Sequence, residues 1–264
     1  MSVSQTGAFL TAVLYLNRYH KLIDFRLREY RFDWKIFRQS IRIGLPTGFQ
    51  HTFVSLGMMA IMAIVNSFGT NVIAGYAAAL RIDSLAILPA MNFSSALATF
   101  VGQNLGAGRS DRIRSGFIAT LIMSGSVALI VMGIVYLLKY QLIGMFTSDP
   151  EVIRIGAEYL VIVSSFYLIF TVMFKINGVL RGAGDTLIPM FITLASLWVV
   201  RIPFALILSK ILGETGIWWS NPAGWAMGLI LSYLYYLTGR WKTKMVVKPK
   251  EVLVSNGTVP PAGP

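Results

Sequence analysis

Six long apolar runs constrain this sequence more than any other feature. A helix needs about 20 apolar residues to cross roughly 30 Å of hydrocarbon, where every backbone polar group must be bonded within the protein. The 264 residues are 55% hydrophobic and 13% charged, whereas soluble domains carry about a quarter charged residues. We therefore expect an all-α, polytopic membrane helical bundle with spans at about residues 43–67, 72–101, 117–138, 157–179, 187–212 and 217–238.

The residues outside these runs complete a four-part organisation. Residues 1–17 are predicted to be a partial transmembrane helix, because they are apolar but lack the basic start of a signal peptide. Residues 18–42 are expected to form a basic cytoplasmic linker, residues 43–240 the six-transmembrane-helix lobe, and residues 241–264 a cytoplasmic tail. The tail has no hydrophobic period, which is typical of disorder.

The positions of the basic residues favour a membrane over a nucleic-acid partner. The net charge is +12, and of the 23 Lys and Arg residues eight lie between Arg18 and Arg42 and five between Arg240 and Lys250. Loops rich in basic residues alternate with poor ones, as the positive-inside rule expects. We expect a multi-pass cell-membrane protein in contact with lipid, with its linker and C-terminus in the cytoplasm and without nucleic acid.

Two predicted cytoplasmic connections have similar glycine-rich sequences, GQNLGAGR at Gly102 to Arg109 and GVLRGAGDT at Gly178 to Thr186. Glycine permits the positive φ of a tight turn between antiparallel helices, and arginine can bind helix carboxyl ends or anionic lipid. Physical chemistry alone predicts structural turns. The candidate residues of these two motifs are Gly102, Gln103, Asn104, Gly106, Arg109, Arg181, Gly182, Gly184 and Asp185.

The sequences of these two turns also resemble those of a known protein family. Together with IGLP at Ile43 to Pro46, RI and ILPA within Arg81 to Ala90, and WVVRIP at Trp198 to Pro203, they look like the C-terminal half of multidrug and toxic compound extrusion (MATE) transporters. The resemblance covers about residues 1–245, from the end of helix six through helix twelve, in matching order and spacing.

The resemblance implies twelve helices in two six-helix lobes that face a central cavity. It also implies cation-coupled antiport, in which inward proton or sodium flow drives export of amphipathic or cationic small molecules. The partner implied is the missing N-terminal lobe or a second copy. We expect no cofactor other than the coupling ion and no metal site, and the sequence contains no cysteine.

Sodium-coupled members of this family have a glutamate in helix seven and an aspartate in helix ten. The corresponding stretches here are GLPTGFQHTFVSL and FYLIFTVMFKING, and neither contains a carboxylate. The resemblance therefore does not bring that sodium site into this lobe.

Asp83 is the only carboxylate well inside a predicted span, roughly 16 Å from the start of its run. An intramembrane charge is a candidate functional group by default. Asp83 could carry a proton or contact a cation, or it could form a structural ion pair with Arg201 or Lys175. Arg81 is two residues away and cannot face Asp83 on the same helix.

The remaining polar candidates have both structural and functional interpretations. Gln50 and His51 could bind a ligand or supply a titratable imidazole, or they could join helices. Arg201 lies deep in its span, where packing is favoured over substrate contact, and Lys175 is expected to extend to the cytoplasmic headgroups. Proline is expected to break the spans at Pro46, Pro89 and Pro203, either as bent helices around a central space or as ordinary kinks in a packed bundle. Residues that would suit an adaptable drug pocket are Phe49, Met58, Met62, Phe93, Tyr167 and Met173.

Three alternatives to drug export arise from the sequence, and the first of them is unfavourable. GAGD at Gly182 to Asp185 matches the GxGD pattern of intramembrane aspartyl proteases, but Asp185 follows a predicted cytoplasmic turn, far in depth from Asp83, so no enzyme activity is expected. A lipid-precursor flippase of the same superfold would have similar composition. A half-length chain could also be an inactive truncated fragment.

Overall fold

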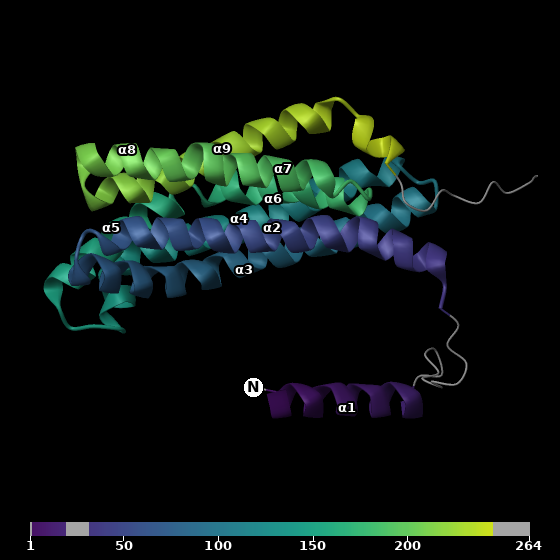
Figure 1. The fold of residues 1–264 in the computed structure, drawn as a ribbon, viewed down its shortest axis with the longest axis horizontal. Helices are drawn as coiled ribbons and strands as arrows, with labels where there is room; N and C mark the ends of the chain where they lie inside the picture. The colour runs from purple at the N-terminus through teal and green to yellow at the C-terminus, as the bar shows by residue number, and fades with distance from the viewer. Residues whose placement is uncertain (1, 20–31, 245–264) are drawn as a thin grey trace, which may run out of the picture. The chain divides into compact units, whose positions relative to one another are not determined.

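The computed structural model describes residues 2–19 and 32–244, and every regular element in these ranges is helical (Figure 1). Contacts divide the chain into two units, residues 1–41 and 42–264. The first unit contains α1 (Ser2–Tyr19) and the start of α2. The helices that follow are α2 (Trp34–Asn66), α3 (Thr70–Gly106), α4 (Asp111–Gly144), α5 (Pro150–Ser164), α6 (Tyr167–Gly182), α7 (Leu187–Leu194), the π-helix η1 (Ala195–Arg201), α8 (Ile202–Leu212), α9 (Glu214–Leu237) and the 3-10 turn η2 (Arg240–Thr243).

The six predicted spans correspond to α2, α3, α4, the pair α5 and α6, the continuous segment α7–η1–α8, and α9. Among the described residues, four of these are long and apolar enough to cross a membrane, and a fifth qualifies if α5 and α6 count as one span bent by 50°. The sixth, α9, is not among them, because Glu214, Asn221 and several glycines and serines dilute its apolar residues. The predicted all-α membrane bundle is confirmed.

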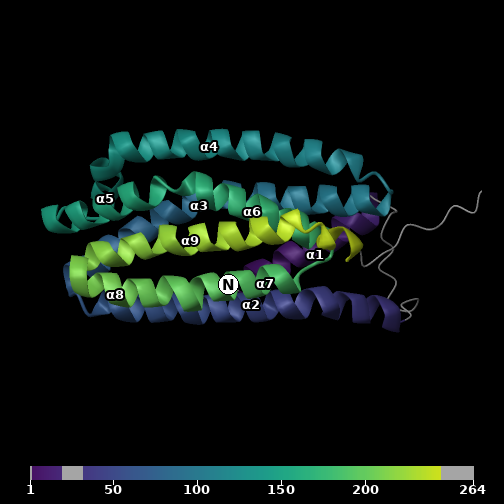
Figure 2. The ribbon, with the colours of Figure 1, turned by 90° about the horizontal axis from the view of Figure 1, so that it is seen from above.

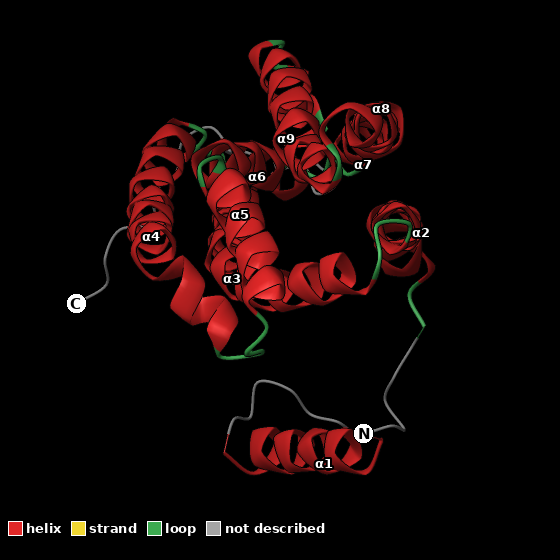
Figure 3. Ribbon diagram, turned by 90° about the vertical axis from the view of Figure 1, so that its left-hand side faces the viewer, coloured by secondary structure: helices red, strands yellow, loops and turns green. Residues whose placement is uncertain are grey.

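Within the second unit, α3 is the central helix. It packs against α4, α5 and α6, while α9 packs against α6 and α8. Figures 2 and 3 show this arrangement, with α4 on one side of α3 and α6 and with α8 and α9 on the other. The side chain of Leu197 in η1 lies against Gly57 of α2, so α2 approaches the bundle at the π-helix.

Two apolar clusters form the core of this unit. One is formed mainly by α3, α4 and α5, with residues of α2, α6, α8 and α9. In it Tyr76 stacks on Trp218 at 5.3 Å, while Tyr159 meets both rings edge-on. The other joins the ends of α3 and α6 to η2 and contains the buried Trp241.

Two of the three predicted prolines do not interrupt their helices. Pro46 lies inside α2 and Pro89 inside α3, and both helices continue through them, so the predicted interruption at these residues is wrong, whereas the predicted alternative of kinks in a packed bundle stays a prediction. A proline removes only one backbone donor, which a helix tolerates when nearby groups satisfy the local carbonyls. The real interruptions are the bend between α5 and α6, which has no proline, and η1, which ends just before Pro203.

Both glycine-rich motifs end a helix in the same way. Gly108 has φ +71° and Gly184 has φ +86°. After each glycine the next residue donates its N–H five residues back, Arg109 to the Asn104 carbonyl at 2.8 Å and Asp185 to the Leu180 carbonyl at 3.0 Å. This hydrogen-bond pattern is the Schellman motif, in which glycine takes the left-handed position without steric cost.

The same motifs also bring α3 and α6 close together. A Cβ on Gly178 would lie 2.7 Å from the Ser94 hydroxyl, and one on Gly182 would overlap the Ala98 carbonyl oxygen. Small residues four apart on one face allow two membrane helices to touch through their backbones. The second motif is therefore both a turn and a helix-packing surface.

The observed boundaries differ from the predicted ones at the linker and at the tail. Helix α2 begins at Trp34 rather than at Ile43, so the end of the predicted linker is helical. The rest of the linker between residues 20 and 31 lies outside the described residues. The predicted disordered tail starts with η2, and its residues from 245 onward also lie outside the described part.

Gly182→Ala should destabilise the protein by about 1–3 kcal/mol, because its new methyl group would force α6 away from Ala98. Gly106→Ala is the matched control, since nothing lies within 4 Å of a Cβ at that helical position. Thermal unfolding of the purified variants in detergent measures both effects. Equal melting temperatures for the two variants would contradict the close crossing of α3 and α6.

Candidate functional site

Asp83 lies in the interior of the bundle with 5% of its surface exposed. The Tyr167 hydroxyl donates to its Oδ1 at 2.7 Å and the Tyr159 hydroxyl to its Oδ2 at 3.2 Å. No described Lys, Arg or His lies within ion-pair distance of Asp83, so the predicted alternative of a structural ion pair with Arg201 or Lys175 is wrong. The carboxyl is held by hydroxyl groups from α5 and α6.

A row of buried polar side chains lies along α6, beginning next to this carboxyl. Tyr167, Thr171 and Lys175 follow one another at four-residue spacing, which places them on one face of the helix. All three are at most 4% exposed. A space of about 10 Å³ next to Tyr167, Thr171 and Pro89 is large enough for one water molecule.

Lys175 does not extend to the headgroups as predicted. The side chain is fully buried, and its Nζ donates to the Ala90 carbonyl at 2.6 Å and lies 5.8 Å from the centre of the Phe93 ring. The prediction is wrong because α3 offers a carbonyl one residue after Pro89, so the amine is satisfied inside the bundle. This contact joins α6 to the proline-containing turn of α3.

Gln50 connects three helices. Its Nε2 donates to Thr193 Oγ1 in α7 at 2.8 Å, and its Oε1 accepts from the Arg181 guanidinium at the end of α6 at 3.1 Å. Gln50 is buried, whereas the adjacent His51 is exposed. The structure therefore separates this predicted pair, and Gln50 alone faces the interior of the bundle.

The two predicted arginines have different surroundings. Arg81 is exposed, with its guanidinium 5.8 Å from the centre of the Phe146 ring. Arg201 is partly buried at the end of η1, and its Nη1 lies 3.5 Å from the Met58 sulfur. Its Nε has no hydrogen-bond partner.

The polar residues of the first turn motif bond locally, whereas Asp185 of the second bonds to another helix. Asn104 donates to the Phe100 carbonyl at 2.8 Å, Gln103 is exposed, and Arg109 forms an exposed ion pair with Asp111 at 3.6 Å. Asp185 is buried and accepts a short hydrogen bond from Tyr235 of α9. Asp83 and Asp185 thus have separate tyrosine partners and do not form the paired aspartates that a protease needs.

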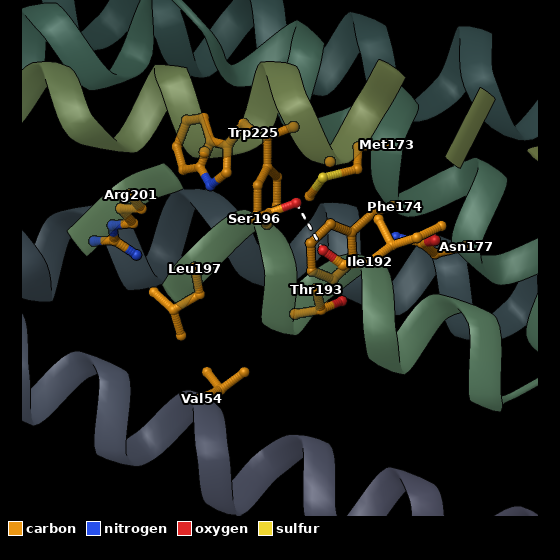
Figure 4. Close-up of a pocket in the computed structure, with 13 residues that line it drawn as sticks. Val54, Met173, Phe174, Asn177, Ile192, Thr193, Ser196, Leu197, Arg201 and Trp225 are labelled. Atoms are coloured by element: carbon orange, nitrogen blue, oxygen red, sulfur yellow. Dashed lines mark hydrogen bonds between the residues drawn. The ribbon is translucent and has the colours of Figure 1, made fainter. Parts of the chain in front are cut away.

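A pocket of about 120 Å³ lies between α2, α6, the segment α7–η1 and α9 (Figure 4). The aromatic part of its wall consists of Phe170, Phe174 and Trp225. Among the described residues that line the pocket, Arg201 is the one charged residue. Asn177, Thr193 and Ser196 add polar atoms. Of the residues predicted for a drug pocket, Met173 lines this one.

Sequence reasoning missed most of this pocket and both partners of Asp83. The spacing of Tyr167, Thr171 and Lys175 within an apolar run was the available signal for a buried polar face. No group of His, Asp and Glu side chains that could hold a metal ion occurs in the described ranges.

Comparison with known proteins gives consistent matches. The family model MatE matches residues 46–207. The probable multidrug resistance protein YpnP of Bacillus subtilis is 34% identical over 94% of this chain and 55% of its own length. The probable multidrug resistance protein NorM of Thermotoga maritima is 32% identical over 83% of the chain and 48% of its own length. The chain thus spans about half the length of the curated relatives it matches.

Solved structures confirm the fold. An outward-facing multidrug resistance MATE family transporter superposes with a TM-score of 0.79 at 19% identity, over 89% of this chain and 54% of the other. A mutant of the Vibrio cholerae MATE transporter VcmN gives 0.77 at 19% identity, over 88% of this chain and 53% of the other.

Tyr167→Phe should destabilise the protein by about 1–3 kcal/mol, because it leaves one oxygen of a buried carboxyl without its donor. Tyr233→Phe is the matched control, since Tyr233 is 50% exposed. Thermal unfolding in detergent reports the difference. A melting temperature for Tyr167→Phe equal to that of the control would mean that the hydrogen bond to Asp83 contributes nothing to stability.

Proposed function

Since the chain belongs to the MatE family, we propose that it is one lobe of a multidrug exporter in the cell membrane, moving amphipathic or cationic small molecules. The relatives named as multidrug resistance proteins support this proposal, and they are about twice as long as the chain. An N-terminal lobe or a second copy of this chain would supply the other half of the cavity.

The observation on which the coupling mechanism rests is the environment of Asp83. It lies roughly 20 Å along α3 from Thr70. It is buried, with two hydroxyl partners, and no Lys, Arg or His in the described part of the chain lies within ion-pair distance of it. Ionisable groups at such depth occur where ions or protons are bound or moved. We expect Asp83 to bind the coupling ion that drives export.

A proton fits this environment better than sodium. A tyrosine hydroxyl can either donate or accept a hydrogen bond, so Tyr159 and Tyr167 can stay bonded to Asp83 whether its carboxyl is ionised or protonated. Sodium would need several oxygen ligands at once, and the two tyrosine hydroxyls are the only side-chain hydrogen-bond partners of Asp83 among the described residues.

The transport step would be a rocking of this lobe against its partner, which exposes the cavity to each side in turn. Gln50 joins α2 to α6 and α7, so these helices would move together as part of one rigid lobe. The basic linker and the C-terminus would stay on the cytoplasmic side, where anionic lipid can contact them.

Ethidium efflux tests this function in drug-sensitive bacteria that express the chain with the N-terminal half of Bacillus subtilis YpnP. We expect efflux from this pair and loss of efflux to the empty-vector level with Asp83→Asn, because the amide cannot be titrated. Asp111→Asn is the matched control, because Asp111 is exposed at the start of α4. Expression and membrane insertion are measured for each variant.

Retained efflux with Asp83→Asn would overturn the role of Asp83. Efflux that collapses with a protonophore and does not depend on sodium would support the proton, and the opposite dependence would identify sodium. No efflux from any pairing, despite insertion, would contradict drug export and favour a different substrate, such as a lipid precursor, or an inactive half.

A further inference from the structure

The pocket at η1 has room for one aromatic ring. Its volume is about 120 Å³, close to the roughly 150 Å³ of an engineered protein cavity that binds benzene. Its apolar wall includes Phe170, Phe174 and Trp225. Figure 4 shows the flexible thioether of Met173 on the same wall as Phe174 and Trp225. Such a wall favours a flat apolar group.

Arg201 gives the pocket a single positive charge. No described Asp or Glu lies within ion-pair distance of its guanidinium, and its contact with the Met58 sulfur is weak because a thioether is a poor acceptor. Its Nε is buried without a partner. The pocket therefore holds a cation whose hydrogen-bonding capacity is largely unused.

The other buried polar groups near the pocket are already satisfied. Gln50 uses both ends of its amide, and the Lys175 amine is bound to the Ala90 carbonyl. Among the described residues, three buried side-chain atoms have no hydrogen-bond partner: Arg201 Nε, Thr171 Oγ1 and Trp218 Nε1. Neither Thr171 nor Trp218 lines the pocket, and neither is charged.

Glycines on α9 let its backbone lie close against Arg201 and Met173. A Cβ on Gly224 would lie 3.1 Å from the Arg201 Cβ, and one on Gly228 would lie 2.5 Å from the Met173 sulfur. Arg201 itself ends the π-helical segment, a rare geometry that is frequent at functional sites. Local backbone geometry and α9 together hold this side chain at the pocket.

We infer that this pocket binds an aromatic ring bearing an anionic group, such as an arylcarboxylate. The planar guanidinium matches a carboxylate with paired hydrogen bonds, and an organic cation would be repelled by the same charge. The inference rests on the proposed function in one respect, namely that the ligand is a transported substrate or the anionic end of one.

Three probes of nearly equal size and different charge test this inference: 4-fluorobenzoate, 4-fluorobenzamide and 4-fluorobenzylamine. Their binding to the full chain in lipid nanodiscs is titrated by ligand-observed fluorine NMR, with empty nanodiscs as the blank. We expect the anion to bind about 10- to 100-fold more tightly than the neutral amide, as for a charge-assisted hydrogen bond, and the cation not to bind. This comparison needs no variant.

Arg201→Gln should weaken 4-fluorobenzoate binding by about 10- to 100-fold and bring it to the level of the amide. Arg81→Gln is the matched control, since Arg81 is exposed and does not line the pocket. Binding of the amine at least as tight as that of the benzoate, benzoate binding unchanged by Arg201→Gln, or no binding of any probe would each overturn the inference.

The binding experiment and the efflux experiment test separate claims, so a negative result in one does not decide the other. Arg201-dependent benzoate binding without drug efflux would leave the pocket standing and remove the proposed export function. Efflux without benzoate binding would leave export standing and remove the anion site.

Discussion

Close contact between α3 and α6 underlies the rest of the lobe. Gly178 and Gly182 allow the two helices to meet at Ser94 and Ala98, and buried polar groups are then satisfied across this contact. Tyr167 reaches Asp83, Lys175 reaches the Ala90 carbonyl, and the Ser94 hydroxyl donates to the Phe174 carbonyl at 2.5 Å. Hydrocarbon offers no water to any of these groups, so a looser crossing would leave Lys175 and Ser94 without their partners and Asp83 with Tyr159 alone.

This constraint explains what the sequence could and could not predict. The spans followed from the length of the apolar runs, because hydrocarbon thickness fixes that length. The partners of Asp83 and Lys175 did not follow, because they depend on which faces of two helices meet, and hydropathy contains no such information. Lys175 was expected at the headgroups because a long side chain usually reaches them, but its amine donates to the Ala90 carbonyl inside the bundle.

The sequence also failed to predict where the helices are interrupted. Proline is the usual sequence signal for an interruption, yet α2 and α3 continue through Pro46 and Pro89, and α5 and α6 separate at Ser165 and Phe166 without a proline. Phe166 packs edge-on against Trp219 of α9 at 5.8 Å, so tertiary packing accompanies this bend. The glycine turns were more predictable, since positive φ is a local property of Gly108 and Gly184.

Asp83 and Arg201 differ in how completely their hydrogen-bonding atoms are satisfied, and this difference supports the different roles proposed for them. Asp83 has a hydroxyl on each oxygen, so the bundle already stabilises it and only a small ion or proton can be added without displacing a side chain. Arg201 has one weak sulfur contact and an unpartnered Nε beside an apolar space. A buried donor without a partner costs free energy that a ligand with a suitable acceptor recovers on binding. Under these proposals, hydrogen-bond satisfaction would separate the group that takes up the coupling ion, Asp83, from the group that recognises a substrate, Arg201.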